Sequence, residues 1–279
     1  MAKYELLPEQ LIYEGVLTES DFFAPEPLDE EAILAIHDAD YWARLKSLNL
    51  TRQEERKTGF PHSQQLIDRE IRIMQGTVQG AEFALQDGVG FNVAGGTHHA
   101  FTDRGEGFCL LNDIALGAQH LLSKNEVSQV LVVDLDVHQG NGTAQIFSGR
   151  PEVFTFSMHG GKNYPMHKEI SDRDVPLPDG IEDHDYLKLL DLQLGDLFEQ
   201  VQPDFVFYQA GVDVLKSDKI GRLGMTIDGC KQRDRQVLEA CKKHEVPVHI
   251  TMGGGYSERL KDIVEAHANT YRLAKEIYF

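Results

Sequence analysis

A buried strand that turns abruptly into acids and an imidazole constrains this chain most. Residues 131–142 read Leu-Val-Val-Asp-Leu-Asp-Val-His-Gln-Gly-Asn-Gly. The apolar start is typical of a strand covered on both faces, as in a parallel sheet. Buried carboxylates are costly unless a cation or donors meet them, so we interpret Asp136 and His138 as metal ligands at a strand's carboxyl end. The alternative at this point is a strand end at which Asp134 and Asp136 accept backbone N–H groups.

The composition is that of an ordinary globular chain. Of the 279 residues, 41% are hydrophobic and 26% are charged, and no Pro/Ser/Gly-rich linker interrupts them. We therefore predict one domain spanning residues 1–279. The net charge of −18 argues against direct nucleic-acid binding. It is compatible with steering a cationic substrate, although simple solubility is the favoured explanation.

Cysteine usage and the lack of long apolar runs favour an intracellular protein. Cys109, Cys230 and Cys241 lie far apart, which is typical of free thiols rather than of a disulfide framework or a cysteine-based zinc site. We find no run of membrane-spanning length and no signal-peptide pattern in residues 1–10. These features predict a soluble cytoplasmic protein without a membrane partner; they leave the oligomeric state unknown.

Hydrophobic periodicity predicts strands that alternate with helices, which indicates an α/β fold with a central, mostly parallel sheet. The predicted strands are residues 89–93, 130–136, 153–158, 205–208 and 246–251. The predicted helices are residues 63–85, 114–124, 186–201, 227–244 and 260–277, the fourth of them as a mostly polar surface helix. Residues 1–26 are expected to be an irregular lead-in, and residues 160–182 a loop.

Five of the predicted strand ends carry polar or glycine-rich residues: His98-His99, Asp134/Asp136/His138, Ser157/His159, Asp213 and Gly253-Gly254-Gly255-Tyr256. Parallel strands end at one edge of the sheet, so these groups can converge. A metal held by Asp136, His138 and Asp213 would keep an open position, which is the catalytic pattern. Such a donor set suits zinc, and also iron(II) or manganese, and the metal would polarise a carbonyl and acidify a water.

The two adjacent histidines are candidates for the general base and acid. Each needs an acceptor on its second ring nitrogen, and Asp134 and Asn141 are the candidates. Tyr256, after three glycines, could donate to a developing oxyanion. Each feature alone has an ordinary structural explanation, and their joint occurrence at successive strand ends is what favours a site.

The ordered motifs resemble those of the zinc-dependent histone deacetylase family from about residue 25 to the end of the chain. The motifs are Gly-Thr-His-His-Ala (96–100), Gly-Phe-Cys-Leu-Leu-Asn-Asp (107–113), Asp-Leu-Asp-Val-His-Gln-Gly-Asn-Gly (134–142), Ala-Gly-Val-Asp (210–213) and Gly-Gly-Gly-Tyr (253–256). The Gly-Gly-Thr before the histidine pair, the His-Gln-Gly-Asn-Gly run and the compact size favour the class IV, histone-deacetylase-11-like branch.

The resemblance implies a three-layer α/β/α domain of the arginase/deacetylase type, with Zn²⁺ (or Fe²⁺) as cofactor. It implies that Asp136, His138 and Asp213 are the metal ligands. The catalytic residues would be His98, His99, Asp134, Asn141 and Tyr256. The walls of a channel for a lysine side chain would be Gly107, Phe108, Tyr164, Gly254 and, as a weaker candidate, Ile220. A monovalent cation (K⁺) beneath the zinc would use Asp134, Asp136, His138, Ser157 and Met158, partly through backbone carbonyls.

The chain also departs from the family pattern. Asn141 replaces the aspartate of many relatives, so we expect His99 to be less basic. Leu110 replaces a common aromatic residue, and the usual Arg-Pro-Pro-Gly lead to the histidine pair is absent. An arginase-like two-metal site is disfavoured because Gly140 and Gly211 stand where it needs carboxylates.

We therefore predict a metal-dependent amidohydrolase that removes acetyl or longer acyl groups from acylated lysine by zinc-activated water. One alternative is a small-molecule deacylase acting on acetylated polyamines or similar amines. Another is a catalytically silent scaffold that binds acyl-lysine. The residues leave open the acyl-chain length and which histidine serves as the base.

Overall fold

Six parallel strands form the centre of the molecule. The computed structural model describes residues 2–279, and the order of its strands is β1-β6-β5-β2-β3-β4. The strands are β1 (Val89–Asn92), β2 (Val130–Asp134), β3 (Val153–Gly160), β4 (Arg173–Leu177), β5 (Phe205–Gln209) and β6 (Val248–Thr251). Every paired neighbour runs parallel, which confirms the predicted sheet.

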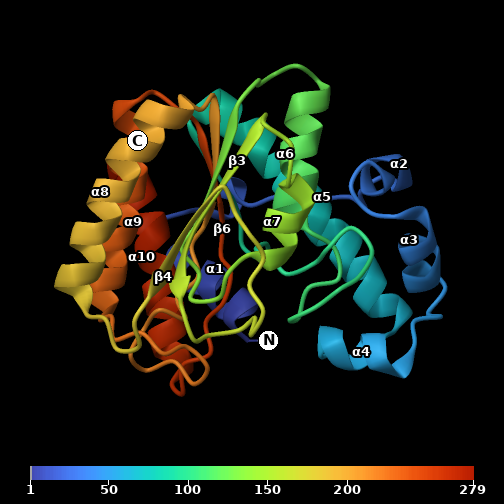
Figure 1. Cartoon of the computed structure of the whole chain (residues 1–279). Helices are drawn as coiled ribbons and strands as arrows, with labels where there is room; N and C mark the ends of the chain where they lie inside the picture. The colour runs from blue at the N-terminus through green and yellow to red at the C-terminus, as the bar shows by residue number, and fades with distance from the viewer. Residues whose placement is uncertain (1) are drawn as a thin grey trace.

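Helices cover both faces of the sheet and complete three layers (Figure 1). One face carries α8 (Asp183–Val201), α9 (Ile227–Lys243) and α10 (Leu260–Tyr278), and the other carries α5 (Gln64–Asp87), α6 (Asp113–Ser123) and α7 (Asn141–Phe147). The shorter helices α2 (Glu30–Leu34), α3 (Ala39–Lys46) and α4 (Arg52–Thr58) lie outside α5. The predicted α/β/α architecture is therefore confirmed. Among residues 2–279, no helix is long and apolar enough to cross a bilayer.

Strand β2 shows why the opening apolar run has no polar alternation. Leu131 and Val133 pack into the core under α8, α9 and α10, whereas Val130 and Val132 pack into the core under α5 and α6. All four are buried. A strand buried on both faces places whatever follows it at the sheet edge, which here is the acidic segment.

The long helix α5 begins and ends as its sequence indicates. Ser63 precedes it, and its hydroxyl accepts the Leu66 N–H at 3.2 Å. Gly88 ends it with a left-handed φ of 86°, a conformation that glycine adopts without steric cost. The predicted stripe faces the core through Ile67, Met74 and Val78.

Two expectations about secondary structure were wrong. The lead-in contains α1 (Lys3–Tyr13), which packs Leu7 and Leu11 against α10 although Pro8 lies inside the helix. The loop 160–182 contains strand β4, whose single paired neighbour, β3, leaves it at the sheet edge, where Pro176 is tolerated.

The helix predicted to lie on the surface, α9, is half buried. Cys230, Val237, Leu238 and Cys241 belong to the core, and the charged pair Arg233–Asp234 is fully buried beside them. Polar composition was misleading because these two charges satisfy each other inside the protein. All three cysteines are buried free thiols, as predicted.

Candidate active site

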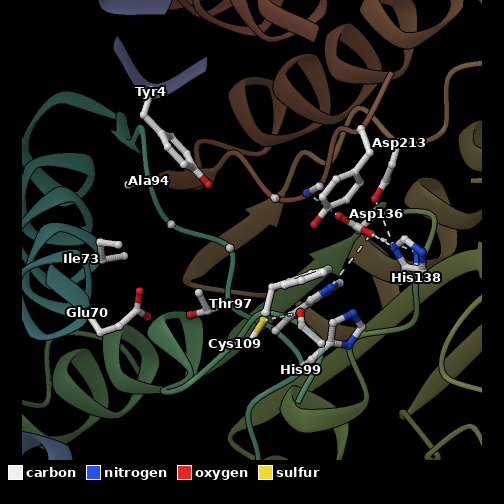
Figure 2. Close-up of a pocket in the computed structure, with 18 of the residues that line it drawn as sticks. Tyr4, Glu70, Ile73, Ala94, Thr97, His99, Cys109, Asp136, His138 and Asp213 are labelled. Carbon is white, nitrogen blue, oxygen red and sulfur yellow. Dashed lines mark hydrogen bonds and ion pairs between the residues drawn. The ribbon is translucent and has the colours of Figure 1, made fainter. Parts of the chain in front are cut away.

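The three predicted metal ligands meet at the carboxyl edge of the sheet (Figure 2). Asp136 and His138 follow β2, and Asp213 follows the neighbouring β5. One ligand atom of each residue lies within 4.8 Å of the others, and all three residues are buried. Because β2 and β5 pair directly, a fixed register brings together residues 75 positions apart or more.

The donor atoms of the three residues face one another. His138 Nδ1 lies 3.1 Å from Asp136 Oδ1 and 3.2 Å from Asp213 Oδ2. The remaining carboxylate oxygens accept backbone N–H groups, with Asp213 Oδ1 bonding Val137 N and Asp136 Oδ2 bonding Gly254 N. Asp213 Oδ2 is buried and has no hydrogen-bond partner among the described residues. An unsatisfied buried oxygen aimed at an imidazole fits a metal ion.

The pKa shifts of these residues also favour a bound cation. Burial, followed by the charge of Asp136, raises the pKa of Asp213 to about 7. Burial alone would lower the pKa of His138, but the carboxylates of Asp136 and Asp213 outweigh it and raise this pKa to about 10. The site therefore holds a proton tightly when no metal competes for it. Two carboxylates and one imidazole suit a divalent ion such as zinc.

Two glycines let the backbone approach the ligands. A Cβ at Gly254 would overlap Asp213 Oδ2, and a Cβ at Gly211 would overlap Asp136 Oδ2. These close approaches explain why glycine occupies both positions, and Gly211 leaves no space there for the second-metal carboxylate of an arginase-like site.

The first histidine of the pair is held by an acid. His98 Nδ1 lies 2.7 Å from Asp134 Oδ2, and both groups are buried. Burial lowers the pKa of His98, but the charges of Asp134 and then Asp136 outweigh it and raise the pKa to about 9. His98 is thus set up to carry a positive charge at neutral pH.

The second histidine is held by an amide. His99 Nδ1 lies 2.6 Å from Asn141 Oδ1, so Nδ1 carries the proton and donates it to the amide oxygen. Burial, followed by the neighbouring charges of His98 and His138, lowers the pKa of His99 well below its usual value. The direction agrees with our expectation for a neutral partner, and the resulting neutral imidazole leaves Nε2 as an acceptor.

The tyrosine loop is fixed from several sides. Tyr256 N donates to Asp218 Oδ2 at 2.6 Å, and the buried ammonium of Lys3 donates to the Gly253 carbonyl at 3.1 Å. Burial, together with Asp213 and Asp136, raises the pKa of Tyr256. The side chain therefore stays a neutral phenol that can donate a hydrogen bond.

The cavity above the metal ligands has aromatic walls. Phe108, Gly107, Gly254 and Tyr256 line it, and the ring of Phe108 lies 6.1 Å from that of Tyr256. Phe60 is a wall that our sequence reasoning missed, with its ring 5.5 Å from that of Phe108. The sequence around Phe60 gave no signal, since the residue lies between α4 and α5 rather than at a strand end.

The other two predicted wall residues lie outside this lining. Tyr164 packs edge-on against His99 at 5.0 Å, and its hydroxyl donates to Glu106. Ile220 is half exposed and accepts a hydrogen bond from Asn163 through its carbonyl. Tyr164 thus supports the catalytic pair from outside the cavity, whereas the structure does not bring Ile220 to the cavity.

The predicted monovalent-cation residues lie on adjacent strands beneath the site. Asp134 at the end of β2 is paired in register with Ser157 of β3, and Met158 follows it. Ser157 Oγ lies 2.9 Å from His159 Nδ1. The grouping is compatible with the expected K⁺ site, which stays a prediction.

Sequence reasoning also missed a group of helix residues that line the cavity, of which Lys3 and Glu70 are buried. Lys3, Tyr4, Arg69 and Glu70 line it, although they come from α1 and α5. No motif marked them, because these residues lie within helices and lack the polar or glycine-rich pattern that follows the strands.

Comparisons with known proteins agree with this geometry. The profile described as "Histone deacetylase domain" matches residues 1–271. An uncharacterized protein of Picosynechococcus sp. is 41% identical over 278 residues, covering 100% of this chain and 93% of that protein. Histone deacetylase 2 of Arabidopsis thaliana is 30% identical over 255 residues, covering 88% of this chain and 66% of that protein. Human histone deacetylase 1 is 27% identical, and the match covers 89% of this chain and 55% of that protein.

A solved structure extends the likeness to three dimensions. The crystal structure of an HDAC homolog complexed with SAHA superposes with a TM-score of 0.84 at 25% identity, covering 95% of this chain and 76% of that one. The aligned part of the plant and human enzymes amounts to 66% and 55% of their lengths. The comparisons do not single out the class IV branch, which stays a prediction.

Proposed function

Because the chain belongs to the histone deacetylase family, we propose that it removes acyl groups from the ε-amino group of acylated lysine. Family membership and the solved neighbour indicate a hydrolase acting on acetylated amides. The observation that carries the proposal is the convergence of Asp136, His138 and Asp213, with Asp213 Oδ2 unpaired among the described residues, beside one histidine held by a carboxylate and one held by an amide.

Asp136, His138 and Asp213 would hold the metal. A bound divalent ion would polarise the acyl carbonyl and lower the pKa of a water molecule. Zinc is our preferred ion, with iron(II) as the alternative, and K⁺ beside Ser157 is part of the same proposal.

The two histidines divide the proton chemistry according to their partners. Neutral His99, with Nδ1–H donated to Asn141, accepts a proton from the attacking water at Nε2. His98, held by Asp134, keeps its charge and stabilises the negative charge that develops nearby. His99 then gives its proton to the leaving amine. This division assigns the roles of the two histidines, which the sequence left open, and it is part of the proposal.

Tyr256 would supply the remaining stabilisation. Its phenol stays protonated and can donate to the oxygen of the tetrahedral oxyanion. Its loop is tied to Asp218 and to Lys3, so little reorganisation is needed when the oxyanion forms. The rings of Phe60 and Phe108 would pack against the methylene groups of the lysine side chain.

The test is turnover of an acetyl-lysine peptide by the zinc-loaded protein, compared with turnover of an acetylated polyamine. We expect peptide turnover to exceed polyamine turnover, and expect Tyr256→Phe and His99→Ala each to lose at least about a hundredfold in kcat/KM. Preference for the polyamine would favour the small-molecule deacylase instead. Absence of turnover with both, or variants equal to the parent, would contradict the proposal and favour a silent scaffold.

A further inference from the structure

The cavity that the metal ligands line is also lined by a second group of residues, which we call the inner chamber. The chamber residues, drawn in Figure 2, are Tyr4, Glu70, Ile73, Ala94, Thr97 and Cys109. Phe108, which lines the same cavity, is 45% exposed and marks its entrance, whereas Glu70 is 3% exposed. If the lysine of a substrate enters past Phe108 and its carbonyl reaches the metal ligands, the chamber residues are the part of the lining left for its acyl group.

One carboxylate oxygen in the chamber has no partner. Glu70 Oε1 accepts a hydrogen bond from Arg69 Nη1 at 2.9 Å. Glu70 Oε2 is buried and bonds to none of the residues that the structure describes. In Figure 2 the carboxylate points toward Thr97 and the space beside it. The Thr97 hydroxyl cannot satisfy Glu70, because it already donates to Asp113 at 2.8 Å.

The charges around Glu70 make the chamber a poor site for a long alkyl chain. Lys3 and Arg69 also line the cavity. The aliphatic side chains of the chamber are those of Ile73 and Ala94. An alkyl chain would seal Glu70 away from water and leave its free oxygen unpaired, which is costly. A hydroxyl on a short acyl group would instead donate to that oxygen.

We propose, on the basis of the deacylase function above, that Glu70 is a specificity-determining residue. It selects short hydroxyacyl groups over the unsubstituted acyl group of the same length, and both over fatty acyl chains. This assigns the acyl preference that the sequence left open.

The experiment compares kcat/KM of the zinc-loaded protein on lysine peptides that carry 3-hydroxybutyryl, butyryl, decanoyl or acetyl groups. We expect the parent to prefer 3-hydroxybutyryl to butyryl by about tenfold, the size of one hydrogen bond. Glu70→Met removes the acceptor at similar volume, so the preference should disappear and turnover of the decanoyl peptide should rise. Glu70→Gln keeps an acceptor and should keep part of the preference.

Asp68→Asn is the matched control, because Asp68 is an exposed carboxylate on the same helix and outside the chamber. The ratio of its kcat/KM values for the 3-hydroxybutyryl and butyryl peptides should equal that of the parent. Thermal melting shows whether each variant is folded. A parent ratio of one or less, or an unchanged ratio in Glu70→Met, would overturn this inference while leaving the deacylase function intact. Absence of turnover with all four peptides would contradict the proposed function, and this inference with it.

Discussion

Two fully buried aspartates of this protein have opposite surroundings. Asp234 Oδ1 accepts hydrogen bonds from Arg233 at 2.7 and 2.9 Å and from the Tyr208 hydroxyl, and Oδ2 accepts from Thr270. Asp213 bonds one backbone N–H through Oδ1, and its Oδ2 has no hydrogen-bond partner within residues 2–279. Both side chains have no solvent exposure. The carboxylate of Asp234 is fully hydrogen-bonded within the protein, which is typical of a structural role. The carboxylate of Asp213 keeps one oxygen without a hydrogen bond at the sheet edge, which favours binding of an external cation.

The satisfied cluster also supports the open one. Arg233 Nη1 donates to the Gly211 carbonyl at 2.6 Å and to the Leu135 carbonyl at 3.3 Å. Leu135 directly precedes the ligand Asp136, and Gly211 lies two residues before Asp213. The guanidinium therefore links the two strand ends that carry the ligands.

The comparison is tested most strongly by Asp213→Asn. We expect kcat/KM to fall by about a thousandfold or more, the scale of losing one member of a catalytic set, and bound zinc to fall in parallel. The metal-free variant should be as stable as the metal-free parent or more stable, because one buried charge is removed. Metal analysis and thermal melting of the same sample measure both effects; a variant that keeps its zinc and activity would break the comparison.

The opposite outcome is expected for Asp234→Ala. Removing this carboxylate leaves the guanidinium of Arg233 buried and unpaired, which should cost about 3–5 kcal/mol of unfolding free energy. Urea unfolding of the metal-free protein measures this cost. The double replacement Arg233→Met/Asp234→Leu should recover most of it, since no charge is left unpaired. A loss below about 1 kcal/mol in the single variant would show that the cluster is not the structural one.

Glu70 is intermediate between Asp234 and Asp213, because one of its carboxylate oxygens is hydrogen-bonded and the other has no partner among the described residues. Its pKa predicts that the stability of the protein depends on pH. Burial raises the pKa of Glu70 to about 7, against 4.5 for the exposed group, with Arg69 opposing the shift. A raised carboxyl pKa means that the folded state binds more protons. Its stabilising effect is complete below pH 4.5 and is lost as the pH rises through 7.

The total change attributable to Glu70 is about 3 kcal/mol. Unfolding free energies of the parent and of Glu70→Gln, measured between pH 4.5 and 8.5, give the size of this effect. The difference between the two proteins should move in favour of Glu70→Gln as the pH rises. A constant difference across this range would contradict a raised pKa.

The smallest expected effect concerns the two histidines, of which His98 has a charged partner and His99 a neutral one. Asn141→Asp gives His99 a charged partner like that of His98, so the pKa of His99 should rise. Since His99 acts in its neutral form, the acidic limb of the kcat/KM profile should move to higher pH by about one unit. Asn112→Asp is unsuitable as a control because Asn112 is buried; Asn125→Asp, in the turn after α6, is the suitable one and should leave the profile unchanged.

The ligand set could be predicted from sequence because parallel strands place their carboxyl ends at one edge. One apolar run precedes Asp136 and His138, and a second precedes Asp213. This pattern was enough to predict that the three side chains lie close together. The histidine partners followed from motif order in the same way. Their charge states needed the structure, since the pKa of His99 depends on burial and on His98 beside it.

The inner chamber could not be predicted, for a physical reason. Lys3 and Tyr4 reach it from α1, a helix in the segment that we expected to be an irregular lead-in. Glu70 and Arg233 sit on helices whose charged residues usually face solvent, and only three-dimensional packing shows that these two are buried. The one-domain range, the K⁺ site and the cytoplasmic location stay predictions.

The central claim is that the open carboxylate of Asp213 belongs to a catalytic metal centre. The most direct measurement is a titration of the metal-free protein with Zn²⁺, following zinc binding and acetyl-lysine turnover together in the parent and in Asp213→Asn. The account predicts that parent turnover rises from baseline to a plateau at one zinc per chain, and that the variant stays at baseline. Turnover that is independent of zinc, or a variant that reaches the same plateau at the same zinc concentration, would contradict it.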